Sequence, residues 1–183
     1  MNGRNTKEKL FGSAKECAFL AVFVALLIAS QLALSAIPGV EIVSVLFIAY
    51  SFVFGISRGA FSAVAFSLLR CFLFGFSPTV LALYLVYYTF LAFVFGGLGK
   101  RPMKTAWKQI LLLTPVACVC TALFTGLDNL LTPLFYGYTA QAWKLYAVAS
   151  LYFMIPQVIC TAITVPLLFF PLKKAFTLAR RGL

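Results

Sequence analysis

Few side chains in this sequence can carry charge or chemistry. Its 183 residues include only four acids and no histidine. Glu41 and Asp128 lie at the ends of apolar runs, and Arg70 lies inside one. An unpaired cation within a bilayer costs at least ~2.5 kcal/mol, so Arg70 is a candidate for ligand contact or for a buried pair with one of these acids. The alternative is that its long side chain reaches the membrane interface.

Polar residues also recur at helical spacing inside apolar runs. One stripe comprises Thr114, Cys118, Thr121, Thr125, Asp128 and Asn129. Hydrogen bonds between helices would account for the hydroxyl groups alone. An acid, an amide, an arginine and several tyrosines together indicate a cavity for a polar, partly aromatic small molecule. The candidate binding residues are Glu41, Arg70, Tyr84, Tyr87, Tyr88, Thr125, Asp128, Asn129 and Gln157.

Catalytic, metal and nucleotide motifs are missing from the sequence. It contains no HExxH, no GxSxG and no paired carboxylates within one segment, which argues against hydrolases and metalloproteases. Cys118 and Cys120 have no histidine to help bind zinc. The Gly99–Lys100 pair lacks the spacing of a phosphate-binding loop. We therefore expect no enzyme activity, no catalytic residue, no metal and no cofactor in this chain.

The composition indicates the elements that must position these residues. Hydrophobic residues make up 63% of the chain and charged residues 10%, whereas charged residues run near ~25% in soluble proteins. The mean hydropathy is +1.02. The sequence predicts an all-α integral membrane protein, one membrane domain over 1–183 with six transmembrane helices. These helices are expected at about 14–36, 42–55, 60–74, 79–95, 106–126 and 145–170.

The basic residues predict the orientation of these helices. The net charge is +11, and thirteen of the fifteen Lys and Arg residues lie near the N-terminus, between the second and third helices, between the fourth and fifth, or at the C-terminus. An excess of basic residues marks the cytoplasmic side, so both termini are expected there, in a multi-pass protein of the cell membrane. This distribution accounts for the charge without nucleic acid as a partner.

A row of small residues follows the first helix. Ala21, Ala25 and Ala29 are four residues apart and share one face. Small residues in lipid let another backbone approach closely. The row has two interpretations, packing against a helix of the same chain or docking of another protein.

The layout resembles the substrate-binding (S) component of energy-coupling factor (ECF) vitamin transporters. The resemblance rests on the size, the six helices with both ends inside, the alanine row, and the junction Ile-Pro-Gly-Val-Glu-Ile-Val at 37–43. It implies that the alanine row docks on a transmembrane coupling (T) subunit, while two cytoplasmic ATPases use the ATP. It also implies an outer-half substrate cavity, capped by the loop between the first two helices and lined by the last three, in a bacterial cytoplasmic membrane.

Within that family, the resemblance points to a vitamin or related micronutrient, with a queuosine precursor or cobalamin as the best match. Two other functions stay open on the residues alone. A proton-coupled carrier could use Glu41 or Asp128 as its titrating group, although both lie near the interface and not at the midplane. A structural membrane subunit would need no polar cluster.

Overall fold

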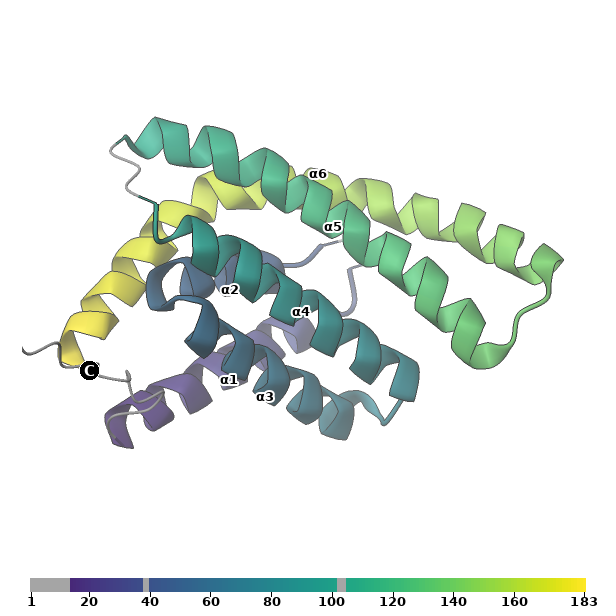
Figure 1. Cartoon of the computed structure of the whole chain (residues 1–183), viewed down its shortest axis with the longest axis horizontal. Coiled ribbons are helices and arrows are strands. Elements are labelled where there is room, and N and C mark those ends of the chain that lie inside the picture. Colours follow the sequence, from purple (N-terminus) through teal and green to yellow (C-terminus); the bar gives the residue numbers. More distant parts are fainter. Residues whose placement is uncertain (1–13, 38–39, 102–104) are drawn as a thin grey trace, which may run out of the picture.

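The computed structural model describes residues 14–37, 40–101 and 105–183, and all its elements are α-helices. They are α1 (Ala14–Leu34), α2 (Val43–Phe54), α3 (Ile56–Phe74), α4 (Pro78–Leu98), α5 (Ala106–Tyr136) and α6 (Ala140–Gly182) (Figure 1). All except α2 are long and apolar enough to cross a membrane. The prediction of an all-helical, multi-pass membrane protein is confirmed at this level. Pro38 and Gly39, from the junction quoted above, lie outside the described residues.

The short helix α2 lies at the centre of the packing. It contacts α1, α3, α4 and α6, and every residue of it except Phe52 is buried. Twelve residues span only about 18 Å, too little to cross a bilayer core. A helix that is apolar all round is stable when other helices surround it. Phe47 and Tyr50 of α2 are accordingly among the most buried large side chains.

The turn between α2 and α3 is shorter than predicted. The segment 56–59 was expected to form a turn, but it is the first turn of α3. Gly55 reverses the chain alone, with φ of 86°, a value that L side chains rarely adopt. Gly96 and Gly99 of the α4 end lie against this turn, where an added Cβ would come 2.7 Å from the Ile56 nitrogen and 2.1 Å from the Phe52 carbonyl oxygen.

The hairpin of α5 and α6 is longer than predicted. The polar stretch 128–144 was expected to be largely a loop, yet α5 continues to Tyr136 and α6 begins at Ala140. Gly137 ends α5 in the left-handed conformation, and the Thr139 side chain caps α6 by accepting from the Ala142 N–H group. The polar residues remain helical because the neighbouring helix supplies their hydrogen-bond partners, as described below.

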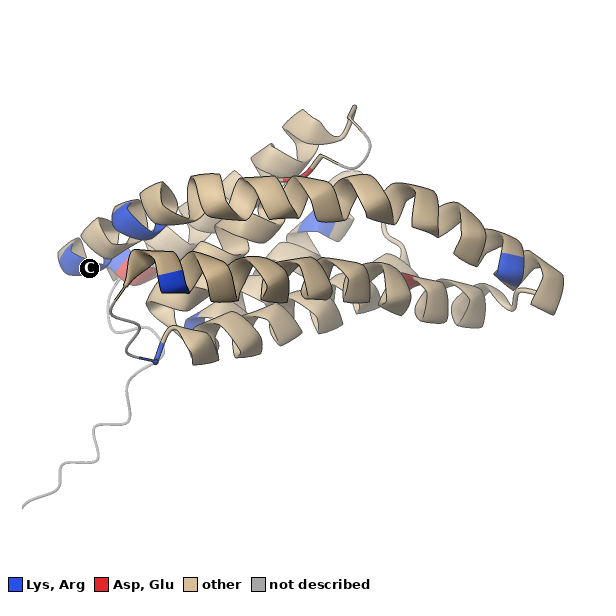
Figure 2. Cartoon of the chain, turned by 90° about the horizontal axis from the view of Figure 1, so that it is seen from above, with Lys and Arg blue, Asp and Glu red and all other residues tan. Residues whose placement is uncertain are grey.

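The two ends of the molecule differ in charge. The described chain begins and ends on the same side (Figure 1), and most basic residues gather there, whereas few lie toward the tip of the α5–α6 hairpin (Figure 2). We call the side where α1 begins and α6 ends the basic end. This arrangement agrees with the expectation that both termini are cytoplasmic, which remains a prediction.

Candidate functional site

A polar cavity lies toward the end of α1 that is remote from the basic end. We call it the Glu41 cavity; its volume is about 270 Å³. Its lining comes from α1, the α1–α2 connection, the start of α2, α3 and α6, namely Ser30, Gln31, Leu34, Ser35, Ile37, Val40, Glu41, Val43, Arg70, Phe74 and Gln157. Three predicted binding residues, Glu41, Arg70 and Gln157, meet here although they are far apart in sequence. Gln31 belongs to the site as well, and the sequence analysis did not select it.

Gln31, Arg70 and Tyr84 form a connected group at this cavity. The Gln31 Nε2 atom donates to the Tyr84 hydroxyl at 2.9 Å. The Arg70 guanidinium lies over the Tyr84 ring, 4.1 Å from its centroid, and 5.3 Å from the centroid of Phe74. Gln31 Oε1 and Arg70 Nε are buried and have no hydrogen-bond partner among the described residues. The residues at the cavity thus carry one acceptor and one donor that are unsatisfied, each at a cost of ~1–3 kcal/mol.

Glu41 contributes an acidic group to the same cavity. Its Oε1 atom accepts a hydrogen bond from the Ser44 hydroxyl at 2.6 Å. Burial raises the pKa of the Glu41 carboxyl above its ordinary value, while the bond from Ser44 acts in the opposite direction. Arg70 does not form the ion pair with an acid that was considered above. The only ion pair within the described residues joins Arg58 and Glu16, at 2.7 Å.

A second cavity lies between α5 and α6. We call it the Asp128 cavity; it has a volume of about 280 Å³ and is lined by Phe124, Thr125, Asp128, Tyr146, Ala149, Ser150, Phe153 and Gln157. The Asp128 carboxylate accepts from the Tyr146 hydroxyl at 2.6 Å and from the Thr132 hydroxyl at 2.7 Å. These bonds already occupy both carboxylate oxygens. The main role of Asp128 is therefore to hold α5 against α6, and not to bind a ligand.

Asn129 also connects α5 with α6. Its Nδ2 atom donates to the Ser150 hydroxyl at 2.7 Å, and its backbone carbonyl accepts from the Trp143 indole at 2.8 Å. Its Oδ1 atom is buried without a partner in the described part of the chain. Tyr146 and Ser150, which bind the polar stripe of α5, lie near the start of the helix that was expected at 145–170, and the sequence analysis did not connect them with Asp128 and Asn129.

The predicted binding residues that line a cavity thus divide between two cavities, where one was expected, and Tyr84 and Asn129 line neither. Gln157 lines both cavities. Aromatic rings fill the space nearby, since Phe124 lies 5.8 Å from Tyr84 and 4.8 Å from Tyr87 between ring centroids. Spacing along each helix correctly placed polar groups on shared faces, but it did not show that large rings would separate those faces.

Tyr87 and Tyr88 do not line either cavity. They are only 4% and 2% exposed and belong to the hydrophobic core. The Tyr88 ring packs edge-on against Phe47 and Phe66, with centroids 5.0 and 5.1 Å apart. The structure thus places Tyr88 against α2 and α3 and Tyr87 against Phe124 of α5, in the core and away from both cavities.

The alanine row of α1 faces away from the rest of the chain. Ala21, Ala25 and Ala29 are all exposed. The opposite face of α1 is buried, through Leu20, Phe23, Val24 and Leu27. The row therefore does not pack against another described helix of this chain. It is open to lipid or to another protein.

The described residues include no group of three or more Cys, Asp or Glu residues that could hold a metal ion. Cys120 is buried, and the Cys118 thiol lies 3.9 Å from the Val158 carbonyl oxygen. In comparisons with known proteins, no family model, no curated protein and no solved structure matches this chain.

Proposed function

We propose that this chain is the substrate-binding subunit of an ATP-driven importer of the energy-coupling factor type, in a bacterial cytoplasmic membrane. The observation that carries the proposal is the Glu41 cavity. Gln31 and Arg70 bring buried, unsatisfied polar atoms to it, and Glu41 adds a carboxyl group. Buried polar groups in native proteins are nearly always satisfied, and a bound polar molecule would satisfy these. The cavity lies on the side of the molecule opposite the basic end. The charges predict that this opposite side faces outward.

The cavity favours a small, polar substrate. Its volume of about 270 Å³ is near the lower end of the ~300–1,000 Å³ range of ligand pockets. Donors and acceptors from Gln31, Arg70 and Glu41 suit the edge of a nitrogen heterocycle, and the Phe74 ring adds an apolar surface. Of the two substrates inferred from the resemblance, these features favour a queuosine precursor over the much larger cobalamin.

The proposed partners are a T subunit and two cytoplasmic ATPases, which would use the ATP. The exposed row of Ala21, Ala25 and Ala29 supports docking on a T subunit. Lipid gives helices little hydrophobic reason to associate, so close contact between small residues provides the attraction. The chain itself has no phosphate-binding loop of the kind that an ATPase needs.

Mass spectrometry of small molecules that co-purify with the protein tests the proposal. We expect the wild-type chain to retain one polar compound, and Gln31→Ala and Arg70→Gln to lose most of it. Lys144→Gln, at the opposite tip from the basic end and outside both cavities, is the control and should retain the compound. Equal retention by the Gln31, Arg70 and control variants, with all of them folded, would contradict binding in the Glu41 cavity.

A proton-coupled carrier is the second candidate, because burial raises the pKa of Glu41 at the cavity. Such a carrier would move substrate with this chain alone. Uptake of the co-purified compound into proteoliposomes that contain only this chain, with a proton gradient and without ATP, distinguishes the two functions. The importer proposal expects no uptake until the partner subunits and ATP are present.

A further inference from the structure

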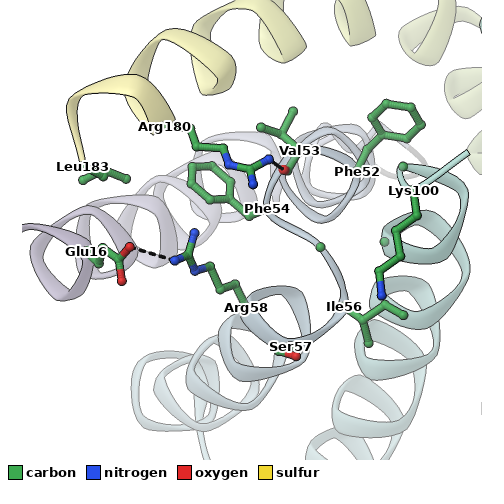
Figure 3. Close-up of a pocket in the computed structure, with 13 residues that line it drawn as sticks. Glu16, Phe52, Val53, Phe54, Ile56, Ser57, Arg58, Lys100, Arg180 and Leu183 are labelled. Atoms are coloured by element: carbon green, nitrogen blue, oxygen red, sulfur yellow. Dashed lines mark hydrogen bonds and ion pairs between the residues drawn. The ribbon is translucent and has the colours of Figure 1, made fainter. Parts of the chain in front are cut away.

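A third and larger cavity lies at the basic end. It has a volume of about 500 Å³, and we call it the basic-end pocket (Figure 3). It is bounded by the start of α1, the α2–α3 turn, the end of α4 and the end of α6. Its lining residues are Glu16, Phe52, Val53, Phe54, Gly55, Ile56, Ser57, Arg58, Gly96, Gly99, Lys100, Arg180 and Leu183. None of them belongs to the candidate substrate site.

Three basic side chains from three parts of the chain line this pocket. Arg58 is paired with Glu16 at 2.7 Å, and Glu16 is the only acidic side chain among the described residues of the lining. Arg180 donates to the Val53 carbonyl oxygen at 2.8 Å, which holds the end of α6 against α2. Lys100 extends beside Ile56 along the pocket wall (Figure 3), and no described residue forms a hydrogen bond or ion pair with its ammonium group. The side chains therefore leave an excess of positive charge.

The backbone adds to this positive potential. α3 begins at the pocket, and no side chain caps its first turn. The Gly59 N–H group bonds to the Gly55 carbonyl, so the N–H groups of Ser57 and Arg58 precede the regular hydrogen bonds of the helix. A helix N-terminus carries a partial positive charge and favours anions. Glu16 neutralises only one of the three basic side chains, so a bound anion would reduce the repulsion that remains among Lys100, Arg180 and this helix end.

Apolar residues complete the lining. Phe52, Phe54 and Leu183 border the same pocket as the basic groups. A lipid headgroup with its glycerol backbone presents this combination of an anionic phosphate and apolar carbon, whereas a free phosphate ion would need no apolar lining. Basic pockets between helices on the cytoplasmic side of membrane proteins suit anionic lipid headgroups. Charge-assisted bonds from arginine and lysine to phosphate oxygens are among the stronger hydrogen bonds.

We propose that the basic-end pocket binds the phosphate group of an anionic phospholipid, through Lys100, Arg58 and Arg180. Lys100 is the side chain that is free to make this contact, and Arg58 and Arg180 frame it. This inference does not depend on the identity of the transported substrate. It requires only that the basic end lies at the membrane surface, as the distribution of Lys and Arg predicts.

Binding of short-chain lipids to the purified full chain tests the proposal. The probes are dioctanoyl phosphatidylglycerol, its zwitterionic phosphatidylcholine counterpart with the same acyl chains, and inorganic phosphate. We expect the anionic lipid to bind preferentially. Lys100→Gln should weaken that binding about fivefold, which corresponds to the ~1 kcal/mol that one basic residue contributes near an anionic surface. Lys174→Gln is the matched control, because it removes the same charge from the basic end outside this pocket, and its effect should stay below about twofold.

Arg180→Gln should also weaken binding, but it removes the bond to the Val53 carbonyl, so a folding defect could contribute. The decisive comparison is therefore made at Lys100, where Lys100→Arg keeps the charge and should restore most of the affinity lost in Lys100→Gln. Equal losses in the Lys100 and Lys174 variants, or equal binding of both lipids, would overturn the proposal. Tight binding of inorganic phosphate without lipid preference would instead assign the pocket to a soluble phosphate compound and overturn the lipid assignment.

Discussion

Arg70 is stabilised by an aromatic ring in place of an acid. Its guanidinium lies 4.1 Å from the centroid of Tyr84, and the Tyr84 hydroxyl in turn accepts from Gln31. A desolvated cation–π contact contributes about 2 kcal/mol, whereas a buried ion pair must first repay the desolvation of both charges. Tyr84 therefore takes the role that the sequence analysis considered for Glu41 or Asp128. Tyr84 therefore orients Arg70 and does not itself line the cavity.

This arrangement predicts a graded response at Tyr84. Tyr84→Phe keeps the ring and loses one hydrogen bond, which should lower the free energy of unfolding by about 1 kcal/mol. Tyr84→Leu loses the ring beneath Arg70 as well and should cost about 3 kcal/mol. Thermal unfolding of the purified variants in detergent measures the difference. Equal destabilisation by both substitutions would show that the contact between Arg70 and the ring contributes nothing.

Asp128 is expected to affect stability more than ligand affinity. Both of its carboxylate oxygens accept hydrogen bonds, from Tyr146 and Thr132, and bonds to charged groups contribute about 1.5–3 kcal/mol each. Asp128→Ala should therefore lower the thermal midpoint clearly. Asp128→Asn, which keeps one acceptor, should lower it less. Retention of the co-purified compound, measured in the same variants, should fall much less than in Gln31→Ala. The opposite ranking would place the substrate in the Asp128 cavity.

At the scale of the helices, α1 has one buried face and one exposed face, and substitutions on the two faces should have different effects. Ala25→Trp should leave substrate retention nearly unchanged and abolish assembly with the T subunit, because a bulky ring prevents close approach at an exposed position. Leu27→Ala is the informative comparison. Leu27 is 0% exposed, so its truncation should cost about 2–5 kcal/mol of stability. Co-purification of the partner with each variant checks the first effect, and unfolding checks the second. Normal assembly of Ala25→Trp would leave the alanine row as a lipid-facing surface.

The helix ends show how far local sequence determines these elements. α2 was expected to be short, and it spans only Val43–Phe54. α6 continues to Gly182, although its end was expected at about 170. The errors at 56–59 and at 128–144 have one cause. Polarity and glycine were taken to end helices, but Gly55 turns the chain in one residue, and α6 supplies partners for Asp128 and Asn129. Such partners come from residues about twenty positions away, which local patterns do not reveal.

At the scale of the whole molecule, the charge distribution predicts sidedness. In a background without native cysteines, we expect Ser77→Cys and Gln141→Cys to react with an impermeant thiol reagent from outside intact cells. Lys108→Cys, at the basic end, should react only after the membrane is permeabilised. The reason is that basic segments are retained on the cytoplasmic side. Labelling of Lys108→Cys in intact cells would reverse the orientation and with it the assignment of the Glu41 cavity to the outside.

The site was less predictable than the fold. Glu41, Arg70 and Gln157 line one cavity, and their shared location could be anticipated because the orientation of each helix fixes which ends are neighbours. The burial of Tyr87 and Tyr88 could not be anticipated, because a tyrosine on an apolar helix has the same sequence signature whether it packs in the core or contacts a ligand. Gln31 was missed, because a single amide near a helix end carries no periodic signal.

The complete enclosure of α2 has a consequence for the order in which the protein is made. α2 emerges from the ribosome before α6, which is one of the helices that surround it. Until α6 has been synthesised, one side of α2 must face lipid or the insertion machinery. The sequence of α2 is compatible with this exposure, because it contains no charged residue. The core around α2 therefore closes only after α6 has been made, and a chain that stops before α6 is expected to be a target for membrane quality control.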